Sequence, residues 1–185
     1  MIPVMLDPAK TRILLVGRGA TAVRRLAWLE EGGARDFAVH SDRPEAALAT
    51  AAGDRLVTRL PSRRALAAAD IVWIADLDPE TSEALARAAR DAGTLVNVED
   101  VKPLCDFHNP SVVRRGDLLM TVSTGGKSPG LAARARRLLE GLFGPEWAER
   151  LDEVSARRDA WRAEGKSLGE VATLTERHFD DRGWL

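Results

Sequence analysis

The chain has 185 residues, of which 45% are hydrophobic and 30% are charged, and its formal net charge at pH 7 is -1. These values exclude a wholly disordered chain and give no global attraction to nucleic acid or to an anionic membrane. No apolar run is long enough to span a bilayer, the N-terminus lacks the pattern of a signal peptide, and the single cysteine, Cys105, cannot form an internal disulfide, so a cytoplasmic protein is expected.

Short apolar runs alternate with helical patterns over the first hundred residues, which predicts a parallel sheet covered by helices. Residues 3–6 are expected to form an additional edge strand. The first parallel strand is expected at 13–16, where it stops at a glycine and leads into an amphipathic helix. Asp78 and Pro79 predict the start of a second helix, over 80–91. The remaining strands are expected at 37–39, 56–60, 71–75 and 95–98.

The pattern changes after residue 100. An irregular segment is followed by an expected strand at 118–122 and a helix at 128–142, and the charged tail has apolar residues at helical spacing, which predicts two or three helices. The predicted fold class is therefore α/β: a Rossmann-type parallel sheet with a small strand-plus-helix dimerisation part and a helical C-terminal tail. The predicted domain boundaries are 1–110, 111–144 and 145–185.

A glycine turn follows the first strand. The sequence Gly17-Arg18-Gly19-Ala20-Thr21-Ala22 fits G-x-G-x-x-(G/A), in which the first glycine allows the tight turn and the second lets a pyrophosphate approach the backbone. The phosphates would accept hydrogen bonds from amides at the helix start. The turn predicts an NAD site formed by Gly17, Arg18, Gly19, Ala20 and Thr21, and the alternative is a structural connection in another doubly wound fold.

A carboxylate stands about 20 residues beyond the turn, as dinucleotide-binding units require. Asp42 could accept hydrogen bonds from both hydroxyls of the adenosine ribose and would repel the 2′-phosphate of NADP, which favours NAD. Ser41 could contribute to this contact or replace it. Asp42 also resembles an ordinary helix N-cap, because Pro44 follows closely.

A second glycine turn lies between the strand at 118–122 and the helix at 128–142. Thr124, Gly125 and Gly126 would leave several amides free at a helix start, with Lys127 beside them, which indicates an anion site. Position 121 is threonine, so this is not a nucleotide P-loop. The alternative is a tight turn in which the glycines adopt positive φ. A basic cluster on the following helix, which could be a solvated face or could bind carboxylates, comprises Arg134, Arg136 and Arg137.

Residues 95–131 resemble the siroheme synthase N-terminal family, whose members are precorrin-2 dehydrogenases and in some cases also sirohydrochlorin ferrochelatases. Beyond the first glycine turn, the resemblance is carried by Asn97-Val98-x-Asp100, Asp106-Phe107-x-x-Pro110 and Ser123-Thr124-Gly125-Gly126-Lys127-Ser128-Pro129. It implies NAD-dependent oxidation of precorrin-2 to sirohydrochlorin, in the biosynthesis of siroheme or of a cobalamin precursor. It also implies a homodimer, and Fe2+ as a further substrate if the chelatase activity is present.

The resemblance implies roles for individual residues. Asp100 lies where the family has its functional aspartate and is expected to be the general base, the alternative being that it caps a turn or orients the substrate. Glu99 stands where family members carry an apolar residue, and this second carboxylate could raise the pKa of Asp100 or share its role. The residues expected to position the tetrapyrrole are Asn97, Thr124, Gly125, Gly126 and Lys127.

No resident metal is expected, because His40, His108 and His178 are scattered and give no metal-ligand spacing. The 185 residues contain no methyltransferase module of the kind found in fused siroheme synthases, so synthesis of precorrin-2 itself is not expected. The rival hypothesis is a sensor module that binds NAD or a tetrapyrrole without catalysis. The first glycine turn fits that hypothesis equally well.

Overall fold

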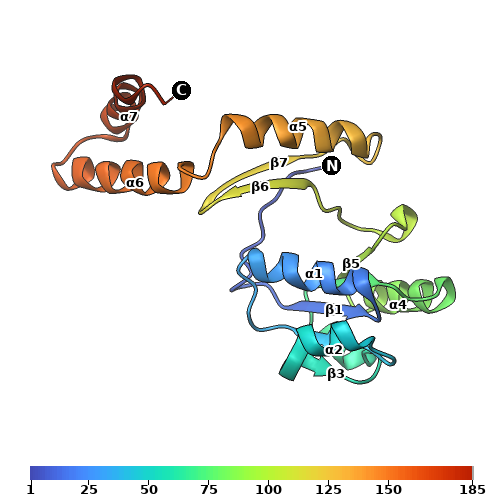
Figure 1. The fold of residues 1–185 in the computed structure, drawn as a ribbon. Helices are drawn as coiled ribbons and strands as arrows, with labels where there is room; N and C mark the ends of the chain where they lie inside the picture. The colour runs from blue at the N-terminus through green and yellow to red at the C-terminus, as the bar shows by residue number, and fades with distance from the viewer. Residues whose placement is uncertain (185) are drawn as a thin grey trace. The chain divides into compact units, whose positions relative to one another are not determined.

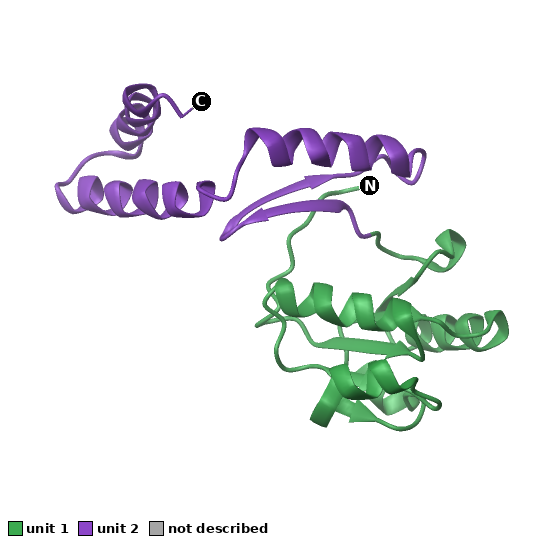
Figure 2. Cartoon of the chain, viewed as in Figure 1, with its two compact units in different colours: residues 1–108 green, residues 109–185 purple. Residues whose placement is uncertain are grey.

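The computed structural model describes residues 1–184 and divides the chain into two compact units, residues 1–108 and 109–185 (Figure 2). The first unit contains the parallel sheet and the helices that cover it. The second contains a two-stranded hairpin and three helices. The domain boundaries drawn from the sequence at 110/111 and 144/145 stay predictions.

The first unit is built on a five-stranded parallel sheet with the strand order β3-β2-β1-β4-β5 (Figure 1). The central strands are buried on both faces, which is why their sequences are continuously apolar instead of alternating. The order reverses at β1, which pairs with β2 on one side and with β4 on the other. The strands are β1 (Ile13–Gly17), β2 (Ala38–His40), β3 (Leu56–Val57), β4 (Ile71–Ala75) and β5 (Leu95–Val98).

Helices cover both faces of this sheet. The side chains of α1 (Ala20–Glu31) and α2 (Ala46–Ala52) pack on one face, and those of α3 (Arg63–Ala67) and α4 (Pro79–Asp91) pack on the other. Two short 3₁₀ turns complete the unit, η1 (Gly53–Arg55) and η2 (Lys102–Leu104). The result is a doubly wound α/β unit, as the sequence predicts.

The second unit begins with an antiparallel hairpin of β6 (Ser111–Arg115) and β7 (Leu118–Val122). Three helices follow, α5 (Pro129–Leu142), α6 (Trp147–Ala163) and α7 (Leu168–Arg182). The side chain of Trp147 is 5% exposed and contacts the rings of Phe143, Phe179 and Trp184. This aromatic cluster joins the ends of the three helices.

Several elements differ from the sequence expectations. Residues 3–6 form no strand, so the predicted edge strand is wrong, and the apolar side chains of that segment are exposed. The expected strand at 56–60 keeps only its first two residues. The sequence patterns missed β6, α2 and α3, each of which is too short or too charged to give a clear period. No helix among the described residues is long and apolar enough to cross a membrane.

Candidate functional site

The first glycine turn closes because Gly17 has no side chain. Gly17 is the last residue of β1 and pairs with Ala75 of β4. A Cβ at Gly17 would lie 2.5 Å from the Cβ of Ala22 and 2.9 Å from the backbone oxygen of Ala75. The small side chain of Ala22 is fully buried against this point. The strand, the next helix and the neighbouring strand therefore approach each other as dinucleotide-binding turns require.

The N-terminus of α1 is capped by a side chain from another element. Gly19 is the N-cap position and has no side chain, and the backbone N of Ala22 donates to Oδ2 of Asp76 at 2.8 Å. Burial opposes ionisation of this carboxyl, but hydrogen bonds from Thr21, Ala22 and Gly19 outweigh that effect and lower the pKa of Asp76. Asp76 directly follows β4 and has a φ of +54°. It was not among the site residues predicted from the sequence.

Arg18, the middle residue of the turn, joins two carboxylates from different strand ends. Its Nε and Nη2 each lie 2.8 Å from an oxygen of Asp42, and its Nη1 lies 3.1 Å from Oδ2 of Asp78. The bond with Arg18 lowers the pKa of Asp42. Helix α2 starts at Ala46, with Glu45 at its N-cap position, so the N-cap interpretation of Asp42 is wrong. The ribose role of Asp42 stays a prediction, and its carboxylate already has a partner.

Ser41 lies one residue beyond β2 and is fully buried. Its backbone N donates to the carbonyl of Val57, whereas its Oγ has no hydrogen-bond partner in the structure. A buried hydroxyl without a partner is uncommon in folded proteins and marks a place where another polar group could bind.

Asp100 sits at the corner of a turn that follows β5. The backbone N of Val101 donates to the carbonyl of Val98 at 3.1 Å, and Asp100, the third residue of this turn, has a φ of +63°. The side chain of Asp100 is exposed. Asp100 therefore lies at the carboxyl edge of the sheet, where open α/β sheets bind their ligands. This position is compatible both with the base and with the turn-capping alternative.

The second carboxylate, Glu99, is held by the helix that follows the glycine turn. Its Oε1 lies 2.6 Å from Nε and 2.5 Å from Nη2 of Arg25 on α1, and both side chains are largely buried. The guanidinium of Arg25 also lies over the ring of Trp28, at 4.7 Å. Because this ion pair compensates its charge, Glu99 serves as a link between α1 and the turn of Asp100 and is not a free acid beside it.

Asn97 is on β5 and is 4% exposed. Its Nδ2 donates to the carbonyl of Phe107 at 2.7 Å, while its Oδ1 has no partner in the structure. The side-chain amide of Asn97 therefore holds the segment that contains Phe107 against β5. The role of Asn97 in binding a tetrapyrrole stays a prediction.

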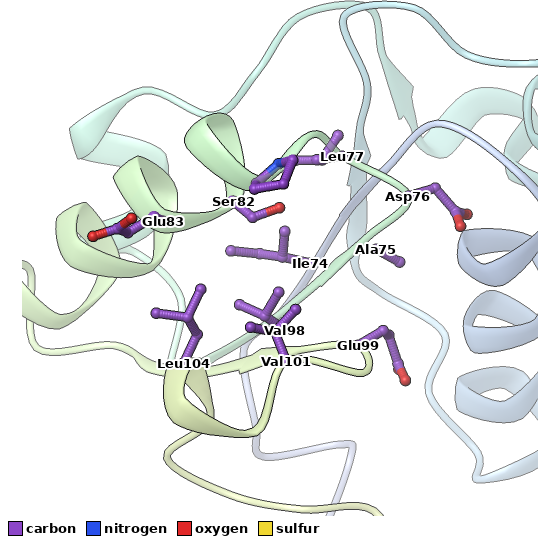
Figure 3. A pocket seen from close by; sticks show the side chains of 11 residues that line it. Ile74, Ala75, Asp76, Leu77, Ser82, Glu83, Val98, Glu99, Val101 and Leu104 are labelled. Carbon is purple, nitrogen blue, oxygen red and sulfur yellow. The ribbon is translucent and has the colours of Figure 1, made fainter.

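A pocket of about 310 Å³ opens at the carboxyl ends of β4 and β5 (Figure 3). Its walls are mainly apolar, with side chains from β4, β5, α4 and the turn of η2. Asp76 and Glu99 also line it, and in Figure 3 their carboxylates point away from Leu104 and towards the same side. Both of these residues bind α1, through Ala22 and Arg25 respectively. A ligand at this edge would thus meet an apolar surface bordered by acids.

The residues at this edge fit a dinucleotide in two respects. The nearest atoms to a Cβ added at Gly19 would belong to two side-chain carboxylates, with Oε1 of Glu45 at 2.8 Å and Oδ2 of Asp76 at 3.4 Å. The unpartnered Oγ of Ser41 lies at the end of the neighbouring strand. A pyrophosphate at this turn would compete with Asp76 for the hydrogen bond from the backbone N of Ala22.

Comparison with known proteins gives a consistent result. Residues 4–111 match the model of a family described as putative NAD(P)-binding. Siroheme synthase 1 of Pectobacterium atrosepticum is 31% identical over 94% of this chain and 39% of its own length. The siroheme synthase of Thiobacillus denitrificans is 32% identical over 96% of this chain and 37% of its own length.

The chain belongs to the siroheme synthase N-terminal family. It spans less than two fifths of the length of these two siroheme synthases. A solved structure of similar fold, "SirC, precorrin-2 dehydrogenase", aligns with all of this chain and 92% of that chain at a TM-score of 0.76 and 23% identity. This family membership confirms the resemblance seen in the sequence. The first glycine turn lies within the residues that match the putative NAD(P)-binding family.

The family segment after β5 is held by structural contacts. Asp106 accepts hydrogen bonds from Nε of Arg90 at 2.8 Å and from the backbone N of Val96 at 3.0 Å, and its own backbone N donates to the carbonyl of Val96. The ring of Phe107 lies 5.0 Å from that of Trp73. Cys105 donates its thiol hydrogen to the carbonyl of Val98, and burial raises the pKa of this thiol. This part of the family pattern therefore supports the turn of Asp100.

The second family segment forms a tight turn before α5. Gly125 and Gly126 have φ values of +64° and +77°, so both need the freedom of glycine. The amide of Lys127 donates to the carbonyl of Thr124, and the amide of Ser128 donates to the Oγ1 of Thr124. The expectation of several free amides is thus wrong for the amides of Lys127 and Ser128. The tight-turn alternative explains why Gly125 and Gly126 are glycines. Binding of a tetrapyrrole by Thr124 to Lys127 stays a prediction.

Two residues of this edge were missed from the sequence, Asp76 and Arg25. A signal for Asp76 was present, because it is the first residue after an apolar strand, as Asp100 nearly is. Arg25 gave no such signal, since its partner is 74 residues away. Its role is visible only in the folded chain.

Proposed function

We propose that this protein is an NAD-dependent precorrin-2 dehydrogenase, which oxidises precorrin-2 to sirohydrochlorin. The observation that carries the proposal is that β1, β2 and β5 are parallel, so the glycine turn, Asp42 and the turn of Asp100 all follow strand ends at one edge of one sheet. The names of the siroheme synthase relatives and of the structural neighbour support this substrate.

In the proposed complex, the residues from Gly17 to Thr21 hold the pyrophosphate and Ser41 and Asp42 hold the adenosine ribose. NAD supplies the acceptor for the hydride that leaves the macrocycle. Asp100 accepts the proton that leaves at a second position, and its exposed carboxylate is available for this transfer. Asn97 and the turn from Thr124 to Lys127 orient the substrate.

The direct test uses purified protein with precorrin-2 and NAD. We expect stoichiometric formation of NADH and the absorption spectrum of sirohydrochlorin. For Asp100→Ala, we expect turnover to fall by about 10²-fold or more, as when a general base is removed, with NAD affinity almost unchanged. If the wild-type protein binds NAD and tetrapyrrole but forms no product, the sensor hypothesis takes the place of the dehydrogenase.

We also propose a second activity, an oligomeric state and a cellular compartment for the protein. Fe2+ insertion into sirohydrochlorin is a second activity in which Asp100 would take up the pyrrole protons, and the same preparations supplied with Fe2+ and sirohydrochlorin test it. The chain acts as a homodimer through its second unit. The reaction takes place in the cytoplasm, which agrees with the short apolar runs and the single cysteine of the sequence.

A further inference from the structure

The helix that should receive the pyrophosphate already holds an anion from the chain itself. The carboxylate of Asp76 accepts from the backbone N of Ala22 at 2.8 Å, and α1 has neither a capping side chain of its own nor an acidic residue in its first turn. Free amides and the positive end of the helix dipole are what a phosphate binds at this place in a dinucleotide site. Two anions cannot use the same amides at once.

The backbone of Asp76 is turned to make this contact. The preceding residue, Ala75, is still paired in the sheet with Gly17. Asp76 then adopts a φ of +54°, in the left-handed region that residues with side chains seldom enter. Hydrogen bonds from the first turn of α1 stabilise its charged form and lower its pKa, so the carboxylate is ionised at neutral pH.

The acids around the glycine turn are not equivalent. Asp42 and Asp78 share the guanidinium of Arg18, which balances part of their charge. Asp76 is stabilised by N–H and O–H donors of α1 instead. An arriving pyrophosphate would therefore compete with Asp76 for those donors and would also be repelled by it.

We propose that Asp76 determines the affinity of the dinucleotide site, because its carboxylate occupies the amides of α1 and must leave them when NAD binds. This inference rests on the proposed function for the identity of the ligand. Asp76 is not part of the G-x-G-x-x-(G/A) segment, yet its carboxylate occupies amides that would bind the pyrophosphate. The protein without cofactor therefore binds NAD less tightly than the glycine turn alone would allow.

The variant Asp76→Asn tests this inference in the full-length protein. Asparagine tolerates the left-handed conformation and can still accept a hydrogen bond from Ala22, so the fold should be kept while the charge is removed. We expect NAD and ADP to bind to the variant at least about tenfold more tightly than to the wild type. The substitution removes the charge that repels the pyrophosphate and weakens the competing hydrogen bond to the amide of Ala22. Adenosine, which has no phosphate, should bind equally to both proteins.

The matched control is Asp70→Asn. Asp70 immediately precedes β4, whereas Asp76 follows it, so the control makes the same change of charge at the opposite edge of the sheet. NAD and ADP affinities are measured by calorimetry, adenosine by NMR titration, and folding by urea denaturation without ligand. Asp70→Asn should leave all three ligand affinities unchanged.

Equal ADP affinity of the wild type and Asp76→Asn, with both proteins folded, would overturn the inference and identify Asp76 as a helix cap that stays in place. Tighter binding by both Asp76→Asn and Asp70→Asn would also overturn it, because net charge alone would explain the gain. If neither the wild type nor any variant binds NAD or ADP, the proposed cofactor site fails first and the inference fails with it.

Discussion

At the scale of single residues, the features that define the site are backbone conformations that the sequence encodes indirectly. Asp76 and Asp100 are the two non-glycine residues with positive φ among the described residues, and both follow strands at the carboxyl edge of the sheet. Such conformations persist where surrounding contacts hold them, and they concentrate at functional sites. Here one is held by the amides of α1 and the other by the turn between Val98 and Val101.

Gly17→Ala should destabilise the protein by about 1–3 kcal/mol, because the added Cβ would overlap Ala22 and the backbone of Ala75. The control is Gly141→Ala in α5, where no atom lies within 4 Å of the added Cβ and alanine favours the helix, so stability should rise by up to about 1 kcal/mol. Urea denaturation of the ligand-free proteins measures both. Equal effects of the two substitutions would contradict the close approach at the turn.

The sequence could predict the glycine turn and Asp100, because each lies next to a strand with an unmistakable apolar run. It could not predict how these residues are paired. Asp42 was correctly placed after β2, yet its bond with Arg18 depends on the return of the chain over 24 residues. The free amides expected before α5 are partly used by Thr124, because a short hydroxyl side chain in a turn bonds to nearby backbone groups.

At the scale of elements, the ion pair between Arg25 and Glu99 joins α1 to the turn that carries Asp100. The central strands β1 and β4 were predicted from continuous apolar runs, because all five residues of each are buried, and the long helices were predicted from their helical spacing. The short elements α2 and α3 were not, because their place is set by packing on the sheet more than by their own pattern. Contacts between elements, such as this ion pair, leave no trace in local sequence.

Arg25→Met should lower the free energy of unfolding by about 2–4 kcal/mol, because it leaves Glu99 charged and mostly buried without a partner. Glu99→Gln should restore part of this loss when added to Arg25→Met, since the unpaired charge is then removed. A double-mutant cycle by urea denaturation measures the coupling, which we expect to be about 1–3 kcal/mol. Purely additive effects would show that the pair does not link the two elements.

At the scale of the whole molecule, the two units differ in how they bury apolar surface. The first has a core on each face of its sheet. In the second, α5 carries three leucines that are 58%, 64% and 69% exposed, at positions 131, 138 and 142, a spacing that aligns them along one side of the helix. The homodimer predicted from the sequence would cover such a stripe.

Leu138→Glu should convert the proposed homodimer to a monomer, because a charge would be buried at the centre of the stripe. The control is Leu168→Glu, a comparably exposed leucine at the first position of α7, which should leave the mass unchanged. Light scattering coupled to size-exclusion chromatography gives the mass of each. A wild-type monomer at all concentrations, or a dimer of Leu138→Glu, would refute assembly through α5.

The contact between Asp76 and α1 also bears on how the protein is made. The first amides of a helix need acceptors from outside the helix, which can be water, a bound ligand or a side chain. Here the chain supplies the acceptor itself from the end of β4, 54 residues further along. The first helix can therefore be capped as soon as the end of β4 is in place in the sheet, without a bound anion.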